Sequence, residues 1–449
     1  MRRIPLFAFL FALCLSTAQA QQQVPPDDAD GARAVASSDD PDAAESQATK
    51  VPLAEIRRYV GVYDAIKQAY VDPVDDHKLM QSAIKGLLLD LDPHSAYLEK
   101  SDAQEFDEET SGAYDGIGVE VLSMPDGTVK VVSAIDDTPA AQAGLRSGDV
   151  IVAVDGRDLV PADAVGPGPL RGKPGTTVKL EVVREGVAKP FEVTLKRDTI
   201  RVASVRGRML EPGYGYIRIS QFQTDTAADF ERTLEKLQAQ SGGKLRGLVL
   251  DLRSNPGGLL TSAVQIADDL LDSGVIVSTR GRMAGNDATF RATPGDRMHG
   301  APVVALVDAG SASATEVLSG ALHDLQRAKI VGSRTFGKGL VQTLLPLDNG
   351  DSVKLTTARY YTPSGKSIQG VGIVPDVVLK PDKATADKQA DDGPAPYTEA
   401  SLPGHLRGED EAEAGDNAGD VLPGDAPIAA ALQELKKPVA QAASPAPKG

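Results

Sequence analysis

The fold of the central region follows from the stretch VVALVDAGSASATEVLSGALHDL, which spans residues 303–325. Five consecutive apolar residues, 303–307, predict a buried strand, and a turn of small residues leads into a helix over 315–325 with apolar residues at helical spacing. Segments of the same two kinds alternate before it, with a strand at 247–252 and helices at 227–240 and 260–271. Because this alternation is typical of an α/β core, we predict an α/β domain over residues 197–380.

The turn GSASATE, residues 310–316, exposes a hydroxyl between the predicted strand and the predicted helix. Backbone N–H groups and the positive end of the helix lie beside such a turn, where they stabilise the anionic oxygen of a tetrahedral intermediate. Small side chains also leave room for a peptide substrate. The alternative is an ordinary helix N-cap, since Ser and Thr favour that position in any helix. Taken alone, the turn favours this alternative.

A lysine in an uncommon setting changes that balance. Lys338 lies between Gly337 and Gly339 in the segment TFGKGLVQ, residues 335–342, with apolar residues on both sides. A serine needs a base within hydrogen-bond reach to act as a nucleophile, and a lysine serves as that base only when burial lowers its pKa from about 10.4. Gln342 either orients the amine by a hydrogen bond or is a solvated or strand-pairing glutamine.

These two segments resemble those of the C-terminal processing peptidases, also called tail-specific proteases. In that family the serine nucleophile precedes its lysine by 25 positions and a glutamine follows the lysine by four, which is the spacing of Ser313, Lys338 and Gln342 here. The spacing selects Ser313 over Ser311. The family usually has a second serine where Thr315 stands, and this departure is conservative. The resemblance therefore implies a Ser313/Lys338 dyad with Gln342 beside the lysine.

Further segments resemble the family in the family's own order, so that the resemblance covers about residues 53–379. They are LDPHSAYL at 91–98, GIGV at 116–119, DLRSNPGG at 251–258 and GIVPD at 372–376. In relatives the Asn-Pro-Gly-Gly turn supplies one oxyanion amide, and the residue after the nucleophile supplies another. This implies Ala314 together with Gly257 or Gly258, and the choice between the two glycines stays open.

Short β-type runs separated by turns fill residues 116–196 and predict a compact β-rich module, which resembles a PDZ domain. The resemblance implies that the loop Gly116-Ile117-Gly118-Val119 and the following strand bind the terminal carboxylate of a peptide; a plain hairpin is the alternative. We place the PDZ domain at residues 104–196. The fold class is accordingly mixed α/β and multidomain, with an α/β serine peptidase core, an inserted PDZ domain and an N-terminal helical segment.

Arg171 resembles the arginine that links the PDZ domain to the catalytic core in some relatives. This implies a regulatory role, and an ordinary solvated arginine is the alternative. Residues 51–103 contain two amphipathic helical stretches, each with an apolar face. That face either packs on the following domain or contacts another subunit, and spacing alone does not choose between the two.

The N-terminus has the order of a cleavable secretory signal, with Arg2 and Arg3, an apolar stretch and the sequence Ala18-Gln19-Ala20. We therefore expect a signal peptide at residues 1–20 and a periplasmic location. Residues 21–50 carry few large apolar side chains, which predicts a disordered spacer. The one cysteine, Cys14, lies inside the signal, so disulfides and cysteine chemistry are not expected in the mature protein.

The chain has a formal net charge of −16, which disfavours nucleic acid as a partner. Much of the acidity lies in the two tails of the chain. We expect residues 381–449 to be a mostly disordered tail with one short helix at 428–435. Histidines and carboxylates show no spacing typical of a zinc site, so we expect neither a metal nor a cofactor.

The resemblance implies a serine endopeptidase that cleaves periplasmic or envelope proteins, which its PDZ domain selects by their exposed C-terminal tails. An activating adaptor protein and a homo-oligomer are further expected partners. One alternative is a Ser/His/Asp hydrolase with His323 and Asp324, but these residues follow Ser313 by about 15 Å along a helix. The other alternative is a catalytically idle PDZ scaffold of the cell envelope.

Overall fold

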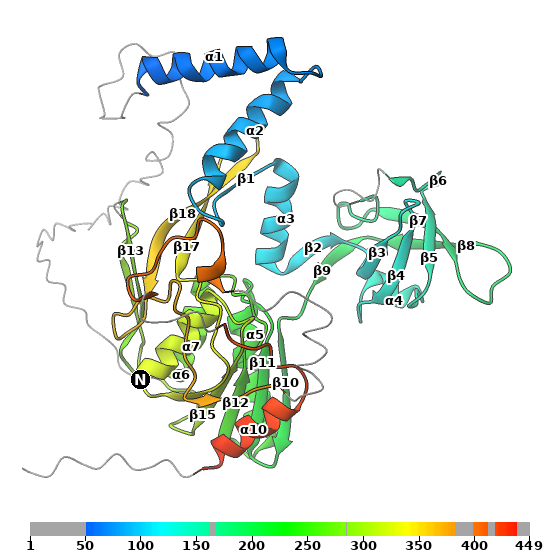
Figure 1. Cartoon of the computed structure of the whole chain (residues 1–449). Coiled ribbons are helices and arrows are strands. Elements are labelled where there is room, and N and C mark those ends of the chain that lie inside the picture. The colour runs from blue at the N-terminus through cyan, green and yellow to red at the C-terminus, as the bar shows by residue number, and fades with distance from the viewer. Residues whose placement is uncertain (1–50, 162–167, 284, 382–397, 412–417, 438–449) are drawn as a thin grey trace, which may run out of the picture. The chain divides into compact units, whose positions relative to one another are not determined.

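The computed structural model of the chain describes residues 51–161, 168–283, 285–381, 398–411 and 418–437 (Figure 1). The expected signal peptide and spacer at residues 1–50 lie outside these ranges. The chain divides into two compact units, residues 1–74 and 75–449. Within the described ranges, no helix combines the length and the apolar character that a bilayer crossing needs.

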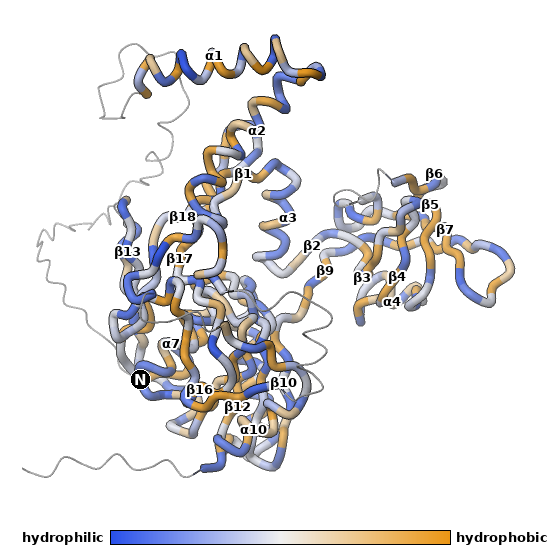
Figure 2. Tube along the Cα trace, viewed as in Figure 1, coloured by the Kyte–Doolittle hydropathy of each residue, from blue (hydrophilic) through white to orange (hydrophobic). Residues whose placement is uncertain are grey.

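The described part of the first unit is dominated by α1 (Leu53–Ala69), none of whose residues is buried. Figure 2 shows hydrophobic and hydrophilic residues interleaved along this helix, and its exposed apolar side chains include Ile56 and Val60. The second unit begins with α2 (Asp76–Leu89), where the Asp75 side chain caps the helix by accepting a hydrogen bond from the Lys78 N–H (3.0 Å). The predicted N-terminal helical segment is thus confirmed.

The α/β core is built on a six-stranded sheet of order β10-β11-β12-β15-β16-β19. Its strands are β10 (Val205–Glu211), β11 (Tyr214–Ile219), β12 (Gly247–Asp251), β15 (Val303–Val307), β16 (Ala328–Gly332) and β19 (Val377–Val378). β10 pairs with β11 antiparallel, and the other pairs are parallel. Parallel neighbours need crossover connections, which contain α5 (Thr226–Gln240), α6 (Leu260–Leu270) and α7 (Ala314–Asp324).

Different parts of the chain cover the two faces of this sheet. Leu248 and Leu250 of β12 belong to a core cluster with residues of α5, α6 and α7. Val249, between them, belongs to a second cluster with Ile428 and Leu435 of α10 (Ala426–Leu435). The alternation follows from the two-residue period of a strand. The C-terminal helix, red in Figure 1, therefore completes the core.

A second, antiparallel sheet carries part of the site. It contains β1 (Ala96–Leu98), β13 (Val275–Gly281), β14 (Ala288–Arg291), β17 (Leu340–Pro346) and β18 (Ser352–Tyr361). β18 pairs with β1, β13 and β17. The segment before the PDZ region and the segment after the lysine therefore meet on one strand.

The β-rich module has its own core cluster and is inserted between two paired strands. The chain enters through α3 (Lys100–Ser111) and β2 (Ala113–Gly116) and leaves through β9 (Asp198–Arg201), which pairs with β2. The module consists of β3 (Val119–Ser123), β4 (Val129–Ala134), α4 (Pro139–Gln142), β5 (Val150–Val154), β6 (Arg157–Asp158), β7 (Thr177–Val183) and β8 (Phe191–Lys196). The mixed α/β fold with an inserted β-rich domain is as predicted.

The described parts of the C-terminal tail, residues 398–411 and 418–437, are more ordered than expected. The short helix is present as α10, and other residues of these two segments pack on the core. Glu399 is fully buried in a short 3₁₀ turn (Glu399–Ser401), and Leu422 is also buried. Composition did not predict this order because a few buried side chains can hold a polar segment in place when the folded core already offers a surface to pack on.

Candidate active site

Ser313 lies at the junction of the β15 turn and α7 in a strained conformation. Its φ is 57° and its ψ is −117°, whereas an ordinary N-cap residue adopts the β region. Sparsely populated backbone conformations cost about 1–3 kcal/mol and cluster at active sites. Ser313 is partly exposed, while Ser311 is fully buried and donates its hydroxyl hydrogen to the Leu252 carbonyl (2.8 Å). The geometry thus separates an accessible serine from a structural one. Ser313 is also the N-cap residue of α7, with Glu316 at the third helical position accepting from its N–H, so the N-cap alternative describes the same residue and does not exclude a catalytic role.

Gly257 packs directly against this serine. A Cβ added to Gly257 would lie 2.9 Å from the Ser313 Cβ and 3.1 Å from the Ala314 nitrogen, so only glycine fits. The Gly257 N–H donates to the buried Asn255 side chain (2.9 Å). Among the hydrogen bonds of the described residues, none uses the N–H of Gly258 or of Ala314. These two N–H groups therefore have no hydrogen-bond acceptor among the described residues.

Glu316 joins the serine turn to the lysine loop, residues 335–339. One carboxylate oxygen accepts from the N–H groups of Ser313 (2.7 Å) and Lys338 (2.9 Å). The other accepts from the Thr335 hydroxyl (2.5 Å) and the Gly337 N–H (2.7 Å). Complete burial raises the pKa of Glu316 to about 7, although all four donors favour the charged form. A single oxygen atom thus brings the backbones of Ser313 and Lys338 together.

The environment of Lys338 lowers the pKa of its amine. Burial is the largest cause, and the positive charge of Lys354 on β18 acts in the same direction. The carboxylates of Glu399, Asp92 and Glu316 oppose the shift. The direction is the one that a lysine base requires, because only the neutral amine accepts a proton.

Gln342 on β17 is oriented by a chain of hydrogen bonds. Its side-chain nitrogen donates to the Thr356 hydroxyl (3.0 Å), which donates to Asp92 (3.1 Å). Burial by itself would raise the pKa of Asp92, but hydrogen bonds from Ser95, the His94 N–H and Thr356 lower it overall. The Asp-Pro-His-Ser segment therefore positions the strand that carries Gln342.

The remaining candidate residues lie elsewhere. His323 contacts Asp324 (3.3 Å) and Asp376 (3.3 Å) at the far end of α7, so these residues give no support to a Ser/His/Asp triad at Ser313. Within the ranges that the structure describes, no group of three or more His, Cys, Asp or Glu side chains is arranged to hold a metal ion.

The loop predicted to bind a carboxylate is fixed through its carbonyl groups. The Ile117 carbonyl accepts from the Ala140 N–H (2.9 Å), and the Gly118 carbonyl accepts from the Ile135 N–H (3.0 Å). Gly116 ends β2 and Val119 begins β3. A Cβ on Gly118 would lie 2.3 Å from the Thr138 Cβ, which explains the glycine.

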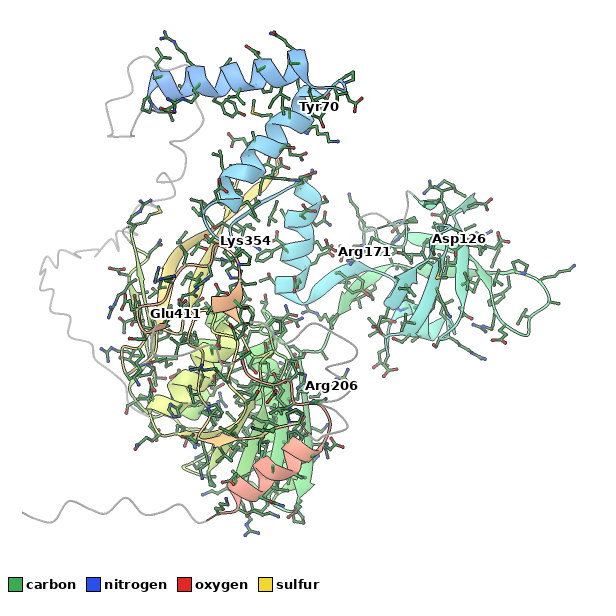
Figure 3. All side chains as sticks on the ribbon, in the orientation of Figure 1. Tyr70, Asp126, Arg171, Arg206, Lys354 and Glu411 are labelled. Atoms are coloured by element: carbon green, nitrogen blue, oxygen red, sulfur yellow. The ribbon has the colours of Figure 1, made fainter. Side chains whose placement is uncertain are left out.

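Arg171 connects the β-rich module to α3. Its guanidinium donates to Glu108 (2.5 Å) and lies 4.0 Å from the centre of the Tyr114 ring, over β2 (Figure 3). The side chain is 31% exposed. Arg171 is therefore engaged on the connection between the two domains, unlike a solvated surface arginine.

Sequence reasoning missed three contributors to the site, namely Glu316, Thr356 and Glu399. Glu316 carried a signal, because a carboxylate in the first turn of an otherwise apolar helix needs partners when it is buried. Thr356 and Glu399 carried none, because each is an ordinary polar residue whose partner lies far away along the chain.

Known proteins resemble most of the chain. The model of peptidase family S41 matches residues 213–379, that of the PDZ domain matches 115–195, and that of the activating protease CtpB N-terminal domain matches 17–102. A carboxy-terminal-processing protease of Bartonella bacilliformis is 41% identical over 387 residues, which cover 85% of this chain and 88% of that protein.

Two further proteins are similar to this chain. The carboxy-terminal processing protease CtpA of Bacillus subtilis is 37% identical over 70% of this chain and 67% of its own length. Among solved structures, the photosystem II D1 C-terminal processing protease is 31% identical, with 73% of this chain and 93% of that chain covered and a TM-score of 0.43.

Proposed function

The chain belongs to the carboxy-terminal-processing proteases of peptidase family S41 and is a serine-type peptidase, and from this premise we propose that Ser313 and Lys338 are its nucleophile and base. The observation that carries the proposal is the Glu316 carboxylate, one oxygen of which holds the backbone of both residues. The strained, accessible conformation of Ser313 and the lowered pKa of Lys338 support it.

In this mechanism the neutral amine of Lys338 takes the proton from the Ser313 hydroxyl, which attacks the carbonyl carbon of a peptide bond. The N–H groups of Gly258 and Ala314 stabilise the oxyanion of the tetrahedral intermediate. Lys338 then gives its proton to the leaving amine, and an acyl-enzyme remains. Water, activated by the same lysine, releases the acyl group and regenerates the serine. Gln342 helps to orient the amine.

The PDZ domain is proposed to select substrates by their exposed C-termini. A peptide that adds a strand beside β3 would place its carboxylate at the loop of residues 116–119. We propose in addition that the protein works in the periplasm, that an adaptor activates it and that it forms a homo-oligomer.

The test compares the mature protein with its Ser313→Ala variant on an unfolded protein that ends in an apolar C-terminal sequence. Cleavage is followed by mass spectrometry, and the same substrate with a charged C-terminal sequence is the control. We expect cleavage that depends on Ser313 and is faster for the apolar tail. Equal cleavage by the Ser313→Ala variant would reject the dyad, and equal rates for the two tails would reject selection by the PDZ domain.

The alternative of an idle scaffold makes a different prediction. If the protein were a scaffold, the mature protein and its Ser313→Ala variant would bind the C-terminal tail with equal affinity. Neither would cleave it, even after addition of a periplasmic extract that contains an activating partner.

A further inference from the structure

We propose that Glu399 is a positioning residue for Lys338, and that the C-terminal segment 398–411, here called the strap, completes the active site. The strap lies outside the segment matched by the S41 family model, which ends at residue 379. The inference rests on the proposed function of Lys338 and adds to it a residue from a distant part of the chain.

Glu399 is fully buried and contacts the lysine loop through its own backbone. Its N–H donates to the Phe336 carbonyl (3.1 Å). Its two carboxylate oxygens have different partners, the Gln369 side-chain nitrogen (2.9 Å) and the His94 Nε2 (2.7 Å). A buried carboxylate costs much free energy unless its oxygens have partners, and both oxygens of Glu399 have one here.

Gln369 transmits this contact to the other end of the loop. Its side-chain oxygen accepts from the Gly339 N–H (2.9 Å), and its nitrogen donates to both Glu399 and the Leu406 carbonyl (2.8 Å). The strap therefore supports the backbone on each side of Lys338, at Phe336 directly and at Gly339 through one buried glutamine.

His94 transmits the contact to the Asp-Pro-His-Ser segment. The His94 ring contacts Glu399. The backbone N–H of His94 donates to Asp92 (2.9 Å), whose carboxylate also accepts from the Thr356 hydroxyl. Thr356 in turn accepts from Gln342. Glu399 is thus where the supports of Lys338 and of Gln342 meet.

The strap has anchors that do not involve Glu399. The Tyr361 hydroxyl donates to Glu409 (2.8 Å), and the Arg359 guanidinium donates to the Arg407 carbonyl (2.6 Å). The strap also approaches the core closely, because a Cβ on Gly408 would lie 1.8 Å from the Gln369 carbonyl oxygen. A substitution of Glu399 alone therefore leaves the strap in place.

Glu399 acts on Lys338 through its charge, in addition to the hydrogen bonds that support the lysine loop. Four charged groups face Lys338, each from a different part of the chain. They are Lys354 on β18, Glu399 on the strap, Asp92 before β1 and Glu316 on α7. His94 faces Glu399. Removal of the Glu399 charge takes away a group that favours protonated Lys338. The pKa of Lys338 then falls further, and the acidic limb of the pH profile moves to lower pH.

The experiment compares Glu399→Gln with Glu409→Gln, which removes one carboxylate from the same strap at the Tyr361 anchor. The measurement is kcat/KM against pH for the unfolded substrate. For Glu399→Gln we expect a loss of about 10-fold or more at neutral pH, because small displacements of a reacting group are costly, and an acidic limb that moves to lower pH. Glu409→Gln should match the wild type. A Glu399→Gln profile that superimposes on the wild type overturns the proposal.

Two further measurements keep the test decisive. In the Ser313→Ala background, the rate of acetylation of Lys338 against pH, followed by mass spectrometry, reports its pKa without any catalysis; an unchanged midpoint in Glu399→Gln overturns the proposal. If Glu399→Gln does not fold, Glu399→Asp keeps the charge and shortens the side chain, so that kcat falls while the acidic limb stays in place. Wild-type kcat in Glu399→Asp also overturns it.

Failure of the dyad is distinguishable from failure of this inference. Without Ser313-dependent cleavage in the wild type, the dyad fails. With such cleavage and no effect at Glu399, the dyad stands and the role of the strap is wrong.

Discussion

The lysine loop is held from two sides by two buried carboxylates that act in different ways. On the α7 side, Glu316 accepts hydrogen bonds from three backbone N–H groups and one hydroxyl. On the strap side, Glu399 uses its own backbone at Phe336 and two side chains, Gln369 and His94. The first side holds the loop directly, and the second holds it largely through intermediaries. The α7 side should therefore tolerate less change than the strap side.

The largest loss of activity is expected when Lys338 or Ser313 itself is replaced. Lys338→Ala and Ser313→Ala should each lower kcat by about 10⁴-fold or more, because members of a catalytic unit are lost together. Both variants should keep the wild-type circular dichroism spectrum and melting temperature to within a few degrees. Full activity in either variant contradicts the assignment of Ser313 as nucleophile and Lys338 as base. In that case neither Glu316 nor Glu399 would be positioning a catalytic base.

Breaking the α7 side should come next. Glu316→Gln replaces an acceptor oxygen by an amide that directs hydrogens at N–H groups, so buried donors lose their partner. We expect the free energy of unfolding to fall by about 2–4 kcal/mol and kcat to fall by about 100-fold or more. Urea unfolding and steady-state kinetics measure both quantities. Glu235→Gln on the exposed face of α5 is the control, and a Glu316→Gln variant that matches it would show that the bridge is dispensable.

A third substitution tests the part of the tail that lies beyond the strap. Ile428 is buried where α10 covers the second face of the large sheet, so Ile428→Ala should lower the free energy of unfolding by about 2–4 kcal/mol. Gln433 on the exposed face of the same helix provides the control, Gln433→Ala. Because α10 lies beyond the strap, kcat of the folded protein should change little. A large loss of kcat without a loss of stability would mean that α10 itself acts on the site.

The smallest effect concerns Arg171, which belongs to neither side. Its pair with Glu108 is partly exposed, and such pairs contribute about 0.5–1 kcal/mol. Arg171→Gln and Glu108→Gln should each change kcat/KM by only a few-fold and leave the unfolding free energy nearly unchanged. A double-mutant cycle measures the coupling. Independent effects of the two substitutions would show that the pair does not link the PDZ domain to the core.

The two sides also differ in how far sequence reasoning reached. The elements on the α7 side were predictable because the strand, turn and helix lie within residues 303–325 and the lysine follows soon after. The pair His94–Glu399 spans 305 positions, and a composition rich in Asp, Ala, Gly and Pro pointed to disorder. Whether such a segment is ordered depends on the surface that receives it, and no local pattern reports that surface.

By itself, the sequence predicted the α/β core and the inserted β-rich module, because apolar periodicity is a local property of the chain. The choice of Ser313 over Ser311 and the role of Lys338 were implied by the resemblance to a family with the same spacing. Only the tertiary structure decided which glycine N–H stays available beside Ala314, that Glu316 joins the two active-site segments, and that the tail brings Glu399 to the lysine. Those depend on hydrogen bonds between groups far apart in sequence, which exist only once the chain has buried them together.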